Sequence, residues 1–248
     1  DMVVFIAATV AGLRLPLRRA TRGATGSSGP RAGAGAVPAD VTESSEWAQP
    51  TGPLAALGPQ VTTHPEVTLA LSAMSVLRGL VGFLTFLLAF SLSRTHTAKW
   101  WFGFMLAASM AGAVVGVLLV PRARRVFTEP QMLALSIWSV ALAAVLAGVV
   151  GGLVMQAFLA FVIGMAGASA KPAFDALVQR YVPVALQGRA FARFETRLQL
   201  VWVIGALLPV VTALPLGAGD VVIATVAGVA GFSYLTGRRA IRHRFRLR

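Results

Sequence analysis

The stretch of sequence between residues 130 and 170 contains no charged side chain. An α-helix rises about 1.5 Å per residue, and about 20 apolar residues suffice to cross the hydrocarbon core of a bilayer. This stretch is therefore long enough for two crossings. Gly148, Gly151 and Gly152 lie near its middle, and we expect a tight turn there because glycine tolerates the backbone conformations that turns require.

Four further apolar runs cover residues 69–93, 100–120, 198–214 and 221–237. Together with the stretch 130–170 they predict six membrane-spanning helices, so we expect an all-α integral membrane protein with a six-helix bundle over residues 67–237. The composition agrees, because charged residues make up 12% of the chain, whereas soluble domains carry about 25%. The lipid bilayer is the expected partner of this bundle.

The segments outside the bundle have different compositions. Residues 1–13 are apolar but too short to cross a bilayer alone, and we interpret them as the end of a truncated transmembrane helix. Residues 14–66 are rich in Gly, Pro, Ala, Ser and Thr, which favours a flexible linker. Residues 238–248 form a basic tail.

The distribution of Lys and Arg predicts the orientation. Of the 22 Lys and Arg residues, only Arg94 and Lys99 fall in the connections on the side opposite the linker, and Arg78 lies inside a run. Because positively charged loops stay in the cytoplasm, we expect a multi-pass protein of the inner (plasma) membrane with a cytoplasmic linker and C-terminus. The net charge of +13 comes from clusters placed to anchor at lipid headgroups, so we do not expect nucleic-acid binding.

Two local sequences resemble signatures of the major facilitator superfamily. Residues 116–125, GVLLVPRARR, resemble the second-half copy of that family's glycine-then-basic loop, with Val120 and Pro121 in place of the acidic residue of the full motif. Residues 180–195 contain RYVP, GRAF and FE in order and look like the cytoplasmic loop between helices ten and eleven of bacterial members, although Gln187 stands where a basic residue is expected.

The resemblance implies two six-helix bundles around a central cavity, each built from two inverted three-helix repeats. This chain would be the second half of such a transporter. Its partners would be the N-terminal six-helix half and a small-molecule substrate. The implied function is secondary active transport of a small molecule, with proton-coupled export as one form of it. The alternative is a non-transporting membrane scaffold or sensor with the same fold.

Aromatic and polar residues inside the runs are candidates for lining a substrate cavity. They are Phe83, Phe86, Phe90, Gln156, Gln199 and Trp202. The three phenylalanines recur at helical spacing, and in the family this helix lines the cavity. Packing against lipid or other helices explains the aromatic residues as well, and hydrogen bonds between helices explain the glutamines.

Charged residues near the predicted cytoplasmic side are candidates for gating. They are Arg78, Arg122, Arg124, Arg125, Asp175, Arg180, Arg189 and Glu195. Arg78 lies inside a run, where a charge either marks a functional position or snorkels to the headgroups. Lys171 precedes Asp175 by four residues, which favours a helical ion pair. Glu195 has no basic helical neighbour, so we expect its partner to be Arg125 or Arg180; a solvated surface acid is the alternative.

The sequence contains no enzyme signature and no sign of a cofactor or metal site. It lacks HExxH, GxSxG and P-loop motifs and has no cysteine, so we expect neither catalysis nor a cofactor. No carboxylate is expected deep in a span, which leaves Asp175, Glu195 or the other half for any proton-coupling acid. Gly112 and Gly116 form a GxxxG pattern that predicts close helix packing.

Overall fold

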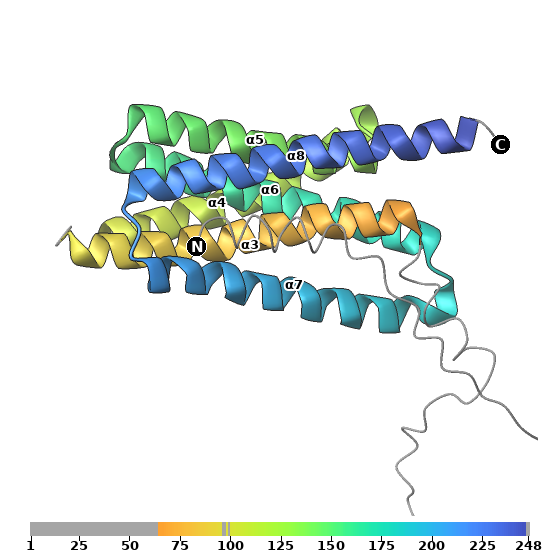
Figure 1. Ribbon diagram of the computed structural model, residues 1–248, viewed down its shortest axis with the longest axis horizontal. Helices are drawn as coiled ribbons and strands as arrows, with labels where there is room; N and C mark the ends of the chain where they lie inside the picture. Colours follow the sequence, from red (N-terminus) through yellow and green to blue (C-terminus); the bar gives the residue numbers. More distant parts are fainter. Residues whose placement is uncertain (1–63, 96–97, 99, 247–248) are drawn as a thin grey trace, which may run out of the picture. The chain divides into compact units, whose positions relative to one another are not determined.

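A computed structural model describes residues 64–95, 98 and 100–246, with side chains described as far as Ile241 (Figure 1). The predicted truncated helix over 1–13 and almost all of the predicted linker lie outside these residues. The described part contains six α-helices, α3 Pro65–Arg94, α4 Trp100–Val126, α5 Glu129–Val150, α6 Gly152–Tyr181, α7 Val184–Thr212 and α8 Leu216–Arg246. All six are long and apolar enough to cross a membrane. The chain is therefore a multi-pass membrane protein, and the prediction of six spans is confirmed.

Local sequence explains where α5 begins and ends. Thr128 precedes the helix and donates its backbone N–H to the side-chain oxygen of Gln131 at 2.9 Å, which forms half of a capping box. Pro130 lies in the first turn, where its lack of an N–H costs no helical hydrogen bond. At the other end, Gly151 and Gly152 have φ values of +69° and +84°. This confirms the turn predicted within the uncharged stretch.

Several helices extend beyond the predicted spans. α6 and α7 are separated only at Val182 and Pro183, so the charged segment between spans four and five is helical rather than a loop. α4 likewise continues through its arginines to Val126, and α8 continues through most of the predicted tail to Arg246. The physical reason is that hydropathy marks only the part of a helix inside the hydrocarbon core. A helix of 30 residues is about 45 Å long, whereas that core is about 30 Å thick.

The helices pack in a definite order around α3. α3 lies between α7 and α8 and also packs against α6 (Figure 1). α4 packs mainly against α6, and α5 packs against α6 and α8. Four helices are thus successive neighbours, in the order α4, α6, α3, α7. The other two, α5 and α8, cover one side of the α6–α3 pair.

Glycines form the closest helix contacts. Those between α4 and α6 are Gly112, Gly116 and Gly164, and those between α3 and α7 are Gly79, Gly82 and Gly205. A Cβ atom added at Gly116 would lie 2.5 Å from the carbonyl oxygen of Met165, and one added at Gly205 would overlap the carbonyl oxygen of Gly79. The close packing predicted from the GxxxG pattern is therefore confirmed, and α3 and α7 form a second contact of the same kind.

Contacts between helix termini define two ends of the bundle. The rings of His64 and Tyr181 stack at a centroid distance of 4.0 Å, and Arg180 Nη2 lies 3.1 Å from Glu129 Oε1. These contacts bring together the start of α3, the α4–α5 connection and the α6–α7 connection. We call this the basic end, because Arg122, Arg124, Arg125, Arg180 and Arg189 lie near it. The connections α3–α4, α5–α6 and α7–α8 lie at the opposite end.

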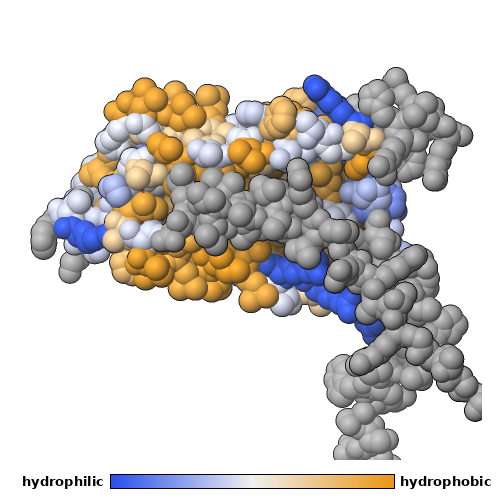
Figure 2. Space-filling view, viewed as in Figure 1, coloured by the Kyte–Doolittle hydropathy of each residue, from blue (hydrophilic) through white to orange (hydrophobic). Residues whose placement is uncertain are grey.

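The outer surface of the bundle is largely apolar. Hydrophobic residues cover much of the face shown in Figure 2, over α5, α8 and α7. On α4, the side chains of Met110, Val114 and Leu118 are all exposed. Such a continuous apolar surface is unfavourable in water, and contact with the bilayer accounts for it.

Candidate functional site

Charged and polar side chains from α3, α6 and α7 meet well inside the helices. Glu195 Oε1 lies 3.9 Å from Arg78 Nη2, and Glu195 Oε2 lies 3.4 Å from Lys171 Nζ. Lys171 Nζ also lies 2.8 Å from Asp175 Oδ1, and Gln199 Nε2 donates to Glu195 Oε1 at 3.4 Å. We call these five residues the polar cluster.

The polar cluster spans α3. Lys171 belongs to α6 and Glu195 to α7, two helices that have few direct contacts because α3 lies between them. Their ion pair therefore joins two helices that otherwise have few contacts, and Glu195 also contacts Arg78 of α3. The charged side chains of the cluster are 29–42% exposed, so the cluster is neither part of the core nor fully solvated. It is accessible to whatever covers this face of the bundle.

The cluster also lies at a defined depth. Arg78 is 13 residues beyond the start of α3, and Glu195 is 11 residues beyond the start of α7, which places both about 16–20 Å along their helices. Lys171 and Asp175 follow the uncharged stretch that ends at Ala170, and the uncharged part of α7 begins only at Leu198. The cluster therefore lies where the apolar parts of α6 and α7 begin at the basic end, with Arg78 inside the apolar run of α3.

Arg78 is the least satisfied member of the cluster. Its only ion pair among the described residues is the 3.9 Å contact with Glu195, and its Nε atom is buried without a hydrogen-bond partner there. Lys171, by contrast, contacts two carboxylates. Because a guanidinium carries five N–H donors, Arg78 retains unused capacity to bind an oxygen-bearing group.

The expected partners of Glu195 were wrong. Arg180 pairs with Glu129 rather than Glu195, and no ion pair links Glu195 to Arg125 in the described part of the chain. The predicted pair of Lys171 and Asp175 is confirmed at 2.8 Å. The contact with Arg78 was missed because the start of α7 was placed 14 residues too late. With the observed start, Arg78 and Glu195 lie at similar depths on neighbouring parallel helices.

The remaining predicted gating arginines lie at the basic end. Arg124 Nη2 donates to the carbonyl oxygen of Pro172 at 2.9 Å, which connects α4 to α6. Arg122, Arg125 and Arg189 are exposed. None of these four arginines contacts the polar cluster through a described ion pair.

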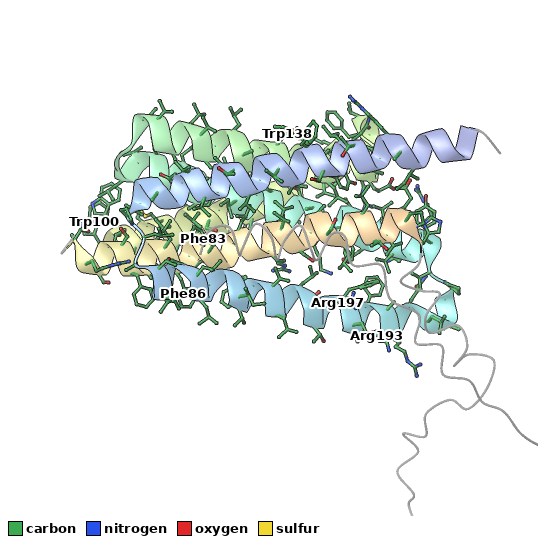
Figure 3. All side chains as sticks on the ribbon, viewed as in Figure 1. Phe83, Phe86, Trp100, Trp138, Arg193 and Arg197 are labelled. Atoms are coloured by element: carbon green, nitrogen blue, oxygen red, sulfur yellow. The ribbon has the colours of Figure 1, made fainter. Side chains whose placement is uncertain are left out.

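Aromatic side chains from α3 and α7 continue this face toward the opposite end. The rings of Phe86 and Trp202 meet edge to face at 6.1 Å, and those of Phe86 and Phe90 stack at 6.3 Å. Phe90 is 39% exposed. Phe83, predicted to belong to the same stripe, is only 2% exposed and belongs to the core (Figure 3). The structure thus places three of the four aromatic candidates together beside the polar cluster.

Gln156 lies elsewhere, in a buried hydrogen bond between helices, the alternative considered for it, but its partner was not predicted. Its Nε2 atom donates to Oδ2 of Asp220 at 2.6 Å, and both residues are at most 2% exposed. Asp220 lies near the start of α8, just before the predicted span, and its burial was not expected. The segment 215–220, PLGAGD, suggests a turn, but α8 begins at Leu216 and Gly219 packs against Leu87. Glycine permits this close approach, and Asp220 is buried with it.

Comparison with protein-family models, with curated proteins and with solved structures found no match to this chain. The described residues contain no group of three or more His, Cys, Asp or Glu side chains arranged to hold a metal ion. The polar cluster, with its neighbouring aromatic residues, is therefore the candidate site on which a function can be argued.

Proposed function

We propose that this chain is the second half of a secondary active transporter resembling the major facilitator superfamily, and that the polar cluster lines its cavity for a small molecule. The observation that carries the proposal is the partly exposed cluster of charges from three helices, which includes Arg78 inside the apolar run of α3. Charged groups that face lipid within an apolar run, as Arg78 would, are costly. The face that bears them therefore requires a polar cover, and a water-filled cavity between this bundle and an N-terminal bundle would supply it.

The pairing of the helices supports the proposal. In two three-helix repeats, α3 would correspond to α6, α4 to α7 and α5 to α8. Under this correspondence the α4–α6 contact is equivalent to the α7–α3 contact, and the α5–α6 contact is equivalent to the α8–α3 contact. All of these pairs pack closely. The two glycine contacts, α4–α6 and α3–α7, are also equivalent. Two inverted three-helix repeats would produce this equivalence.

The residues of this face suggest how a solute would bind. Arg78 has unused donors for a polar group, and Glu195 can neutralise either Arg78 or Lys171. Phe86, Phe90 and Trp202 offer an apolar surface beside these charges. The face thus suits a solute with one polar end and one apolar part. Rocking of this bundle against the N-terminal half would expose the face to each side of the membrane in turn.

The test is counterflow in proteoliposomes containing the complete protein. A panel of radiolabelled amino acids, sugars and carboxylates and of fluorescent amphipathic dyes would be screened for saturable exchange. We expect at least one solute to be exchanged, and Arg78→Gln to change its apparent affinity. Arg94→Gln is the matched control, because Arg94 lies on the same helix at the opposite end and bonds the carbonyl oxygen of Phe90.

Three results would contradict the proposal. Exchange of no solute by folded protein would argue against transport, and solute binding without exchange would favour the alternative of a membrane sensor. Equal effects of Arg78→Gln and Arg94→Gln would show that the polar cluster is not the site.

A further inference from the structure

The contact between Asp220 and Gln156 is the most deeply buried polar pair among the described residues. Asp220 is the fifth residue of α8, and Gln156 is the fifth residue of α6. The two helices have little other contact, so this 2.6 Å hydrogen bond is their main connection. Apolar and backbone groups surround it: Leu87 of α3 packs against Gly219, and Gly148 of α5 faces the Cβ atom of Asp220.

Two oxygen atoms of this pair lack partners. Asp220 Oδ1 and Gln156 Oε1 are both buried without a hydrogen-bond donor in the described part of the chain. Both are acceptors, and buried acceptors are almost always satisfied by a donor. The site therefore lacks a donor rather than an acceptor.

Among the described residues, no cation forms an ion pair with Asp220. The charged residues described on α8 and on the helices packed around this site are Glu66, Arg78, Arg94, Glu129, Lys171, Asp175, Arg180, Arg238 and Arg239. Of these, only Arg94 lies at the same end of the bundle. Its guanidinium Nε donates to the carbonyl oxygen of Phe90, and its side chain is exposed. No described ion pair joins Arg94 to Asp220.

We propose that Asp220 and Gln156 form a proton-binding site, and that a proton taken up as Asp220 changes from carboxylate to carboxylic acid is the coupling ion of the transporter. The coupling role rests on the proposed function; the binding of the proton does not. The added proton removes the uncompensated charge and supplies the donor that the site lacks. Protonation at Oδ1 turns one of the two partnerless acceptors into a donor, while Oδ2 keeps its hydrogen bond from Gln156 Nε2.

A metal ion fits this site less well than a proton. Ions such as Ca²⁺ and Mg²⁺ require about six or more oxygen ligands, whereas only two oxygens are free here. The proton also has a short route. Asp220 and Gln156 each lie four residues from the start of their helix, about 6 Å along it. Opening of the opposite end would hydrate Asp220 and release the proton to that side.

The first experiment detects the proton directly. The infrared spectrum of the complete native protein at neutral pH should contain the C=O band of a protonated carboxylic acid. Asp220→Asn should remove this band, and Gln156→Leu should shift it by removing the amide partner. Glu129→Gln is the control, because Glu129 pairs with Arg180 at the basic end, and it should leave the band unchanged. Absence of the band from the native protein would overturn the proposal.

The second experiment tests coupling. An imposed pH gradient should drive accumulation of the exchanged solute by the native protein, and Asp220→Asn should abolish accumulation while retaining counterflow. Asn is nearly isosteric with the protonated acid, so the variant should fold. Undiminished accumulation by Asp220→Asn would overturn the coupling role. If the native protein exchanges no solute, the transport function fails, whereas the infrared band still decides whether Asp220 binds a proton.

Discussion

Replacing Glu195 by Gln should change transport with little change in stability. The substitution removes the two ion pairs of Glu195, at 3.9 Å to Arg78 and 3.4 Å to Lys171. Lys171 keeps its closer partner Asp175 at 2.8 Å, whereas Arg78 loses its only acid partner among the described residues. The side chain of Gln is nearly isosteric with that of Glu, so packing against α3 is preserved.

The exposure of the side chains determines how much stability the two ion pairs contribute. Because the partners are 29–42% exposed, solvent screens both pairs, and their combined contribution is about 1 kcal/mol. For a bundle of this size, that free energy corresponds to a shift of about 2–4 °C in Tm. The same 1 kcal/mol changes a binding or conformational equilibrium about fivefold, since 1.4 kcal/mol corresponds to tenfold.

The charge of the face determines whether the affinity for a solute rises or falls in this variant. Glu195→Gln raises the net positive charge beside Arg78 by one, so the apparent affinity should rise about fivefold for an anionic solute and fall about fivefold for a cationic one. Counterflow would be measured beside a thermal melt of the same purified variant. Glu129→Gln is the matched control, because it removes a surface ion pair with Arg180 far from the polar cluster.

Two results would refute this reasoning. A large loss of stability with proportionate loss of flux would assign Glu195 a structural role. Unchanged flux and unchanged Tm would identify Glu195 as a solvated acid whose ion pairs contribute nothing measurable.

Three further predictions concern the bundle and its orientation. Because the chain has no native cysteine, a cysteine at Gly217 should react with an impermeant reagent added outside intact cells and one at Gly188 should not; the reverse pattern would invert the predicted topology. Gly116→Leu should destabilise the purified protein by roughly 1–3 kcal/mol through overpacking against α6, whereas Gly103→Ala, where the added Cβ meets nothing within 4 Å, should leave its Tm equal or higher. Protease added to inverted vesicles should cut within residues 21–65 and leave the bundle intact, and resistance there would contradict the predicted linker.

The sequence predicted the features of the fold that depend on local composition. The absence of charge over residues 130–170 was enough for two helices, and Gly151 and Gly152 marked the turn between them. The GxxxG pattern of Gly112 and Gly116 indicated close packing, although the partner helix α6 could not be known from it. In each case a property of neighbouring residues determines the structure.

The candidate site depended on information that local composition does not contain. The charges from Lys171 to Arg197 resembled a loop because hydropathy reports the solvent around a helix and not where the helix ends. The contact of Glu195 with Arg78 joins residues from α3 and α7, and only the three-dimensional packing brings them together. Asp220 followed two glycines that suggested a turn, so its burial depended on how closely α8 approaches Leu87.

The glycine contacts also have a mechanical consequence. The backbones of α4 and α6, and those of α3 and α7, touch directly at the glycines. No long side chains lie between them to deform, so each helix pair should move as a rigid unit. Between α3 and α6, a Cβ added at Gly167 would meet a side chain, that of Val81, at 3.8 Å rather than a backbone atom. We therefore expect the bundle to flex mainly at the contact between α3 and α6. The ion pair of Lys171 in α6 and Glu195 in α7 links the two helix pairs. Its strength should therefore affect how easily the α4–α6 pair moves relative to the α3–α7 pair.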